Sequence, residues 1–263
     1  MAKHVLSNVS KVKIKLAKDN IILLLDFDLT LSPLAKDPTK AFLPEPTKEL
    51  LKKLIKLIPV IVVSGRKLSD VKKRVGITGV RYVGNHGLEY NLAKKHETIK
   101  VSIHARKALS RVAKELVKMK LKYPGIIFED KKYSIALGYR MIRSNEVQPL
   151  ESRFRKMREK IKKEGLLEVR LDKKTFEVRL KTEVNKGTTC LLALQTLQKE
   201  FHKKLTPIYI GDSETDEDAF KALQKNGITI RVGRKNKSDA RWYLRDQREV
   251  KIFLSYLLSV IIK

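Results

Sequence analysis

Short, continuous runs of apolar residues recur along the chain and alternate with helical patterns. The first run, "NIILLLDFD" at residues 20–28, is apolar throughout and ends in polar residues. A second run, "PVIVVSGR" at residues 59–66, has the same character. Strands that are apolar on both faces are typical of a parallel sheet covered by helices on both sides. The first part of the chain therefore predicts an α/β fold with a doubly wound parallel sheet.

Helical patterns stand between and after these runs. "PTKELLKKLIKLI" at 46–58 predicts a helix with Thr47 as its N-cap, and "LSDVKKRV" at 68–75 predicts a shorter one that Ser69 would cap. The alternation of strand and helix resumes with a helix opened by Asn185, Lys186 and Gly187, and it continues to the end of the chain.

The middle of the chain follows a different pattern. An amphipathic helix at 106–122 precedes two strand-like segments, and a second amphipathic helix at 149–165 precedes two more. The strand segments alternate apolar and polar residues, as in an antiparallel sheet with one covered face. This predicts an inserted α+β domain at residues 104–183, between two parts of the α/β core at 1–103 and 184–263.

The net charge of +29 favours polyanions or anionic substrates. The lysines are spread along the whole chain rather than gathered in a tail or block, which is typical of solvated helix faces. We therefore expect weak, nonspecific binding to nucleic acid at low salt and no specific nucleic-acid partner.

Two features bear on location. The only cysteine, Cys190, excludes an intramolecular disulfide and suits a reducing compartment. No apolar segment reaches the length of about 20 residues that a bilayer span needs. We expect a cytoplasmic protein that does not bind a membrane.

Polar residues stand where several predicted strands end and where one helix begins: Asp26, Asp28, Ser64, Lys186, Asp212 and Asp216. The carboxyl ends of parallel strands meet at one edge of a sheet, so we expect these groups to converge. Carboxylates favour a hard cation such as Mg2+, and a lysine and a hydroxyl suit a phosphate. Taken alone, the pair Asp26 and Asp28 leaves three interpretations open: a polar strand end, a metal site, or a nucleophilic carboxylate at a strand tip.

Four segments in order, "DFDLT", "VSGR", "VNKG" and "GDSETDEDAF", resemble the motifs of the haloacid-dehalogenase-like (HAD) phosphatase superfamily. Within that superfamily the chain resembles the trehalose-6-phosphate phosphatases, in "GNHGLE", "PGIIFEDKKYSIALGYR" and "EVR". The resemblance extends from about Ile21 to the last helix. It implies a Rossmann-like HAD core in which the inserted α+β domain is a cap.

The resemblance also implies a role for each core motif. Asp26 is expected to be the nucleophile and Asp28 the general acid and base. Mg2+, the implied cofactor, is expected on Asp26, the backbone carbonyl of Asp28 and Asp212. Ser64 and Lys186 are expected to hold the phosphoryl oxygens.

Supporting positions follow from the same resemblance. Asp216 is expected in or near the metal shell, and Thr30 is expected to support the first loop. Other positions are expected to contact the substrate: Arg66, Asn85 and His86 from the core, and Glu129, Lys131, Arg140 and Glu177 from the cap.

Three residues depart from the family pattern. Leu29 stands where the family usually has glycine. Ser213 replaces an aspartate after the metal ligand, a change expected to weaken Mg2+ binding. Gly138 replaces a histidine before Tyr-Arg and bears on the sugar pocket.

The resemblance implies a Mg2+-dependent phosphatase that converts trehalose 6-phosphate to trehalose and phosphate through an aspartyl-phosphate. A sugar phosphate would be its substrate and a trehalose-6-phosphate synthase its partner. One alternative is a phosphatase for another sugar phosphate, such as glucosyl- or mannosyl-3-phosphoglycerate or sucrose phosphate. The second alternative, suggested by the net charge, is a non-catalytic basic protein that has the same fold and a binding or regulatory role.

Overall fold

The structure is a computed structural model that describes residues 2–16, 20–33, 35, 40–93, 97–172 and 174–262. It divides into two compact units. The core unit comprises Met1–Thr98 with Val184–Lys263, and the cap unit comprises Ile99–Glu183. The division by internal contacts thus falls at residue 98, whereas the sequence analysis placed it after residue 103.

The core unit is built on one large sheet. Its strands lie in the order β1-β13-β12-β11-β2-β3-β4-β5-β6. They are β1 (Lys3–His4), β2 (Asn20–Asp26), β3 (Val60–Val63), β4 (Arg81–Gly84), β5 (Glu89–Asn91), β6 (Glu97–Thr98), β11 (Leu205–Gly211), β12 (Ile228–Val232) and β13 (Trp242–Leu244). All pairs are parallel up to β4, and β5 and β6 extend the sheet antiparallel.

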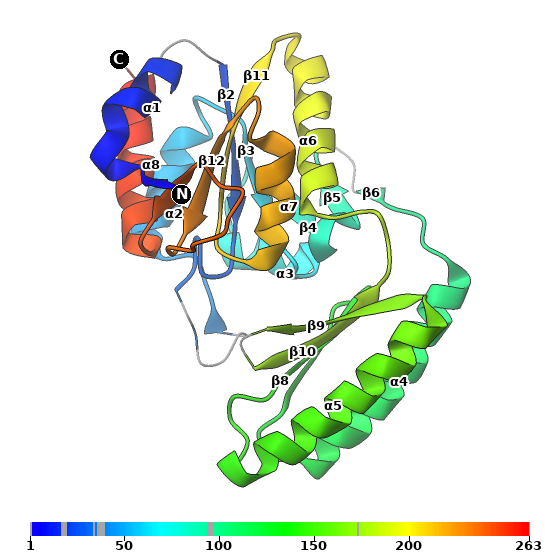
Figure 1. Ribbon diagram of the computed structural model, residues 1–263. Coiled ribbons are helices and arrows are strands. Elements are labelled where there is room, and N and C mark those ends of the chain that lie inside the picture. Colours follow the sequence, from blue (N-terminus) through cyan, green and yellow to red (C-terminus); the bar gives the residue numbers. More distant parts are fainter. Residues whose placement is uncertain are drawn as a thin grey trace. The chain divides into compact units, whose positions relative to one another are not determined.

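Helices cover both faces of this sheet, as Figure 1 shows. Leu23 and Leu25 of β2 point to the face packed by α1 (Val9–Leu16), α2 (Glu45–Leu54), α3 (Leu68–Val75) and α8 (Gln247–Ile261). Ile22 and Leu24 point to the other face, packed by α6 (Lys186–Phe201) and α7 (Glu214–Leu223). Side chains alternate along a strand, so an all-apolar run serves two cores at once. The predicted doubly wound core is confirmed.

The ends of two helices differ from the prediction. Helix α2 begins at Glu45 with Pro44 as its N-cap, and Thr47 lies buried inside the first turn. A proline fits the first turn of a helix because it has no N–H to leave unpaired, so Pro46 allows the earlier start. The N-cap of α3 is Lys67, and Ser69 lies inside that helix. Both predicted caps were wrong.

The cap unit has two helices on one face of a four-stranded antiparallel sheet of order β7-β8-β10-β9. Its elements are α4 (Ile103–Lys122), β7 (Ile127–Asp130), β8 (Ser134–Gly138), α5 (Ser144–Glu164), β9 (Leu167–Asp172) and β10 (Thr175–Leu180). Phe176 of β10 is fully buried and stacks on Phe154 of α5 with ring centroids 4.2 Å apart. The sheet is therefore covered on one side, as its alternation predicted. In the described part of the chain, no helix combines the length and apolar character that a membrane crossing requires.

Candidate active site

Three neighbouring parallel strands of the core unit end at the same level. The register pairs Asp26 of β2 with Val63 of β3, so Ser64 follows directly beside Asp26. On the other side, Leu25 pairs with Ile210 of β11, which sets Asp212 just beyond the sheet edge. The topology thus brings together predicted site residues that lie far apart in the sequence.

Lys186 reaches this edge from the first position of α6. Asn185 caps the helix there, since its side chain accepts a hydrogen bond of 2.9 Å from the backbone N–H of Thr188. The ammonium Nζ of Lys186 lies 2.5 Å from Asp26 Oδ1 and 2.7 Å from Asp216 Oδ1. Lys186 is only 2% exposed. A buried ammonium therefore bridges two buried carboxylates.

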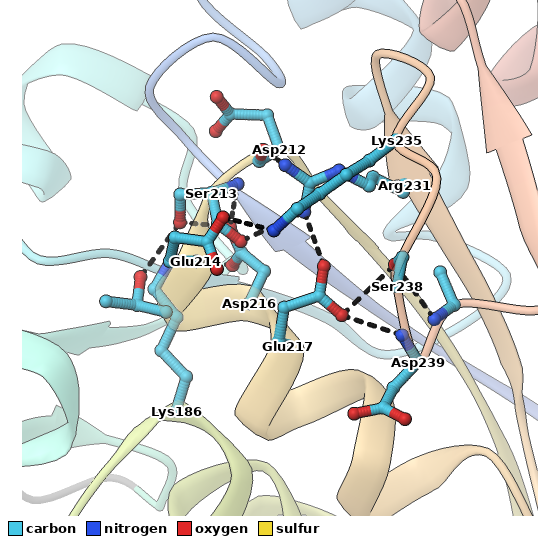
Figure 2. Close-up of polar contacts among 12 residues, drawn as sticks. Lys186, Asp212, Ser213, Glu214, Asp216, Glu217, Arg231, Lys235, Ser238 and Asp239 are labelled. Carbon is cyan, nitrogen blue, oxygen red and sulfur yellow. Dashed lines mark hydrogen bonds and ion pairs between the residues drawn. The ribbon is translucent and has the colours of Figure 1, made fainter. Parts of the chain in front are cut away.

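Asp216, in the first turn of α7, has donors on both oxygens. Its Oδ1 also accepts a hydrogen bond of 2.6 Å from the Tyr209 hydroxyl. Its Oδ2 accepts from the backbone N–H of Ser213 at 2.8 Å and from the Ser213 hydroxyl at 2.5 Å (Figure 2). Gly211 makes room, because a Cβ there would lie 2.4 Å from Asp216 Cγ. This carboxylate is held as an anchor for Lys186.

Two of these contacts were not foreseen from the sequence. Tyr209 looked like one more core residue of an apolar strand, and no sequence signal marks its hydroxyl as a partner of Asp216. Ser213, expected to weaken the metal site, donates a hydrogen bond that an ionised aspartate could not donate.

Burial and neighbouring charges shift the pKa values in this cluster. Burial raises the pKa of Asp26 well above its usual range; Lys186 opposes the shift, and Asp216 and Asp212 add to it. Burial alone would raise the pKa of Asp216 too, but Lys186 and the other donors bring it below its usual value. Burial disfavours the charged form of Lys186, yet the two carboxylates raise its pKa. Added positive charge near Asp26 would oppose the effect of its burial and favour its carboxylate form.

The residues at this edge fit a divalent cation. Asp26, Asp212 and Asp216 each offer a carboxylate oxygen, and these oxygens lie within 4.8 Å of one another. With Lys186 between two of them, three carboxylates outweigh one ammonium by two charges. Mg2+ carries that charge and prefers oxygen ligands. Because Asp216 already accepts four hydrogen bonds, Asp26 and Asp212 are the better ligands of the three.

Asp28 and Arg66 form a bidentate pair beside the nucleophile candidate. Arg66 donates from Nη2 to Asp28 Oδ1 at 2.6 Å and from Nε to Asp28 Oδ2 at 2.8 Å. It also donates to Asp70 at 3.1 Å, and Arg74 donates to the same Asp70 oxygen at 2.7 Å. Ser64, which is buried, accepts a hydrogen bond of 3.1 Å on Oγ from the backbone N–H of Arg66. The partners of the Arg66 guanidinium thus include two carboxylates of the core unit, those of Asp28 and Asp70. Its contact with substrate stays a prediction.

Asn85 and His86 form a tight left-handed turn after β4. Their φ angles are 50° and 55°. The imidazole lies against Gly65, where a Cβ would be 2.4 Å from Cε1 of His86. The Asn85 amide donates a hydrogen bond of 2.8 Å to the buried Glu89. Asn85 therefore holds the turn together, and substrate contacts by either residue stay predictions.

The loop after Asp28 carries the departure at Leu29. Its φ of 60° lies in the left-handed region that favours glycine, the residue that the resemblance leads us to expect there. Gln247 of α8 donates a hydrogen bond of 2.8 Å to the Leu29 carbonyl and holds this conformation. Thr30, the expected support of this loop, is fully buried in it.

In the cap unit, register gathers most of the predicted substrate residues on the polar face of the sheet. Glu129 pairs with Ala136, Ala136 with Glu177, and Glu177 with Arg170, so the four form one row across the strands. Lys131 Nζ lies 3.1 Å from Glu177 Oε1 and 3.8 Å from Glu129 Oε2. Arg170 was not predicted, although the alternation of its strand places it on this face.

The other two cap positions lie at the end of β8. Gly138 is the last residue of the strand and shares the polar face with Ala136. A Cβ at Gly138 would meet Ile127 at 3.8 Å, an ordinary contact, so a larger residue would fit there. Arg140 follows the strand and is exposed.

Comparisons with known proteins agree with one family. The sequence profile described as Trehalose-phosphatase matches residues 24–248. The Trehalose-phosphate phosphatase of Mycobacterium tuberculosis (strain H37Rv) is 34% identical over 208 residues, which cover 79% of this chain and 52% of that protein. The Probable trehalose-phosphate phosphatase I of Arabidopsis thaliana is 32% identical over 252 residues, which cover 91% and 68%. The chain spans about half the length of the mycobacterial relative.

Solved structures with the same fold have lower identity. The trehalose-6-phosphate phosphatase C-terminal domain of C. albicans has a TM-score of 0.83 at 22% identity and covers 98% of both chains. A trehalose-6-phosphate phosphatase related protein has a TM-score of 0.75 at 20% identity, with 92% of this chain and 98% of that chain covered. The C-terminal domain of the Candida albicans trehalose synthase regulatory protein has a TM-score of 0.70 at 14% identity and covers 94% and 97%. These likenesses show the same fold, an α/β core with an inserted α+β domain.

Proposed function

The chain belongs to the trehalose-phosphatase family, and from that premise we propose that it hydrolyses trehalose 6-phosphate to trehalose and inorganic phosphate. The observation that carries the proposal is the buried ammonium of Lys186 beside the carboxylate of Asp26, at the edge of the sheet where Ser64 and Asp212 directly follow β3 and β11. A phosphate monoester needs a nucleophile and positive charge together, because carboxylate and phosphate repel each other.

Asp26 is the proposed nucleophile. One of its oxygens attacks phosphorus and forms an O–P bond, while the bond between phosphorus and the sugar oxygen breaks. The sugar oxygen takes a proton from Asp28. A water molecule then attacks phosphorus and gives a proton to Asp28, and the O–P bond to Asp26 breaks. Phosphate leaves, and both carboxyl groups return to their starting forms.

Asp28 must change partners for this to happen. Asp28 accepts hydrogen bonds from Arg66 on both oxygens, as a carboxylate does. To act as the acid it has to take a proton from solvent and turn away from the guanidinium to reach the leaving oxygen. Lys186 stays charged between two carboxylates and neutralises a phosphoryl oxygen, and Ser64 donates its hydroxyl hydrogen to another. When bound, Mg2+ supplies the remaining positive charge; Asp26, the carbonyl of Asp28 and Asp212 would hold it.

The sugar is proposed to meet the polar face of the cap sheet. Glu129, Lys131 and Glu177 offer charged hydrogen-bonding groups that are partly exposed, which suits the hydroxyls of a disaccharide. Gly138 on the same face favours one alternative, a different sugar phosphate as the true substrate, because its missing side chain leaves that end of the face open.

Phosphate release from a substrate panel tests the proposal. The panel contains trehalose 6-phosphate, sucrose 6-phosphate, glucose 6-phosphate, mannosyl-3-phosphoglycerate and p-nitrophenyl phosphate, each with Mg2+ and with EDTA. We expect release that depends on Mg2+ and prefers trehalose 6-phosphate. Preference for another sugar would keep the chemistry and change the substrate. Absence of release from all five would reject the catalytic proposal in favour of a binding or regulatory role.

Two further parts belong to the same proposal. A trehalose-6-phosphate synthase would supply the substrate, and the reduced Cys190 fits a cytoplasmic location. Pull-down from cell extract with the tagged chain tests the first, and fractionation of the source cells tests the second.

A further inference from the structure

Arg231 of β12 is a buried cation in contact with the loop that carries Asp212. Its Nη2 donates a hydrogen bond of 2.6 Å to the Asp212 carbonyl, and its Nη1 donates one of 3.3 Å to the Ser213 carbonyl. Figure 2 shows the guanidinium directed at this loop. The β11–β12 register places Arg231 opposite Gly211, the residue before Asp212. Arg231 is not among the site residues predicted from the sequence.

Glu217 of α7 holds the same guanidinium from another side. Arg231 Nη1 lies 2.6 Å from Glu217 Oε1. The second oxygen of Glu217 accepts hydrogen bonds from the Ser238 hydroxyl at 3.1 Å and from the Asp239 N–H at 2.8 Å. The planar, five-donor guanidinium is thus fixed by three acceptors on one helix and one loop.

Core packing alone does not account for a charge at this position. Ile230 and Val232 flank Arg231 and are apolar and buried, and Arg231 itself is only 9% exposed. Desolvating a guanidinium costs free energy that an apolar residue would not cost. In return, Arg231 restrains two successive peptide groups, and the side chain of Asp212 projects from the first of them.

We propose that Arg231 is a positioning residue for the metal site: by holding the Asp212 and Ser213 carbonyls it sets the direction of the Asp212 carboxylate. The inference rests on the proposed function, which assigns Mg2+ to Asp26 and Asp212. Groups that orient metal ligands typically contribute 10- to 100-fold to metal affinity.

A role of Arg231 through its charge and a role through positioning Asp212 predict opposite changes in metal affinity when Arg231 is removed. Removing a nearby cation should strengthen the binding of a divalent cation if Arg231 acts only through its charge. Removing an anchor of Asp212 should weaken that binding.

The experiment measures Mn2+ binding without substrate, from the electron paramagnetic resonance signal of free Mn2+. The decisive variant is Arg231→Met with Glu217→Gln, which removes the pair without changing net charge. Arg241→Met, which removes an exposed arginine next to β13, controls for the loss of an arginine elsewhere in the core unit. We expect at least about tenfold weaker Mn2+ binding by the double variant at an unchanged melting temperature, and wild-type affinity for the control.

Several outcomes decide the matter. Equal or tighter Mn2+ binding by the double variant overturns the positioning role while leaving the proposed function intact. Absence of Mn2+ binding by the wild-type chain rejects the metal site of the proposed function, and the positioning role with it. If the double variant does not fold, Arg231→Lys keeps a cation near Glu217 but cannot hold both carbonyls. Affinity equal to that of the wild type would then overturn the role, and weaker binding by a folded variant would support it.

Discussion

The core unit and the cap unit each place carboxylates beside a lysine, but they hold them differently. In the core, Lys186 and Asp26 have side chains only 2% and 6% exposed and lie 2.5 Å apart. In the cap, Lys131 and Glu177 are 13% and 15% exposed and lie 3.1 Å apart, and Glu129 is 37% exposed and lies 3.8 Å away. The core set is closed, and the cap set is partly open to solvent.

This difference follows from where each set lies in its sheet. At the end of a doubly wound parallel sheet, helices cover both faces, so charged groups there are buried and must satisfy one another. On the open face of an antiparallel sheet, water competes for the same groups, and they can exchange partners for the hydroxyls of a ligand. The comparison supports the proposal that the core carries out the chemistry and the cap recognises the sugar, and each part can be tested separately.

The largest effect should come from Asp26→Asn. The amide keeps the size of the side chain but removes the proposed nucleophile, so we expect phosphate release to fall by about 10⁴-fold or more on every substrate. The fold should survive, since the uncharged amide is cheaper to bury than the carboxylate. Steady-state kinetics and circular dichroism melting check this, with Asp239→Asn as an exposed control. Full activity of Asp26→Asn would show that Asp26 is not the nucleophile.

A smaller and selective effect should come from Glu177→Gln in the cap. Loss of a charged hydrogen bond to a sugar hydroxyl should lower kcat/KM for the natural sugar phosphate by roughly 10- to 100-fold. Hydrolysis of p-nitrophenyl phosphate, which offers no sugar, should change by less than about threefold. Glu159→Gln, on an exposed position of α5, is the control and should match the wild type. Equal losses on both substrates would break the division between recognition and chemistry.

A third test concerns stability rather than rate. Burial by itself would raise the pKa of Asp70. The hydrogen bonds and charges of Arg74 and Arg66 outweigh that effect, so the pKa lies below its ordinary value. A lowered pKa in the folded state stabilises the fold above the unfolded value and loses that contribution as pH falls through the folded value. Asp70→Asn should therefore reduce the unfolding free energy by about 1 kcal/mol at neutral pH. The gap to the wild type should narrow in acid, as the pH falls through the lowered pKa of Asp70. Urea unfolding at neutral and at acid pH measures it, and a gap independent of pH would contradict the ionic origin.

The smallest effect should come from Leu29→Gly. A left-handed conformation costs an ordinary residue about 1–2 kcal/mol, and the greater freedom of glycine when unfolded offsets part of that gain. We expect the unfolding free energy to rise by up to about 1 kcal/mol, with phosphate release unchanged. His202→Gly, at the left-handed C-cap of α6, tests the same relief far from the candidate active site along the chain. Lower stability of Leu29→Gly would mean that the leucine side chain contributes more than its backbone costs.

Much of the fold could be read from the chain, because it depends on periodicity. The apolar run before Asp26 and the stripe of α5 through Phe154 each predict an element and its buried face, and the structure confirms both. Helix ends such as Thr47 could not be placed, since several residues near an N-terminus can cap and the neighbouring proline decided the start.

The chain by itself determined the candidates for chemistry, since carboxylates, a lysine and a hydroxyl stand in order where predicted strands end. Only the tertiary structure decided how they are held. Tyr209 and Arg231 lie on β-strands that read as ordinary core, and what distinguishes them is a contact with Asp216 or with the Asp212 carbonyl. Such contacts depend on strand order, register and helix packing, which no local pattern records. The same holds for Arg170, which only pairing with β10 places beside Glu177.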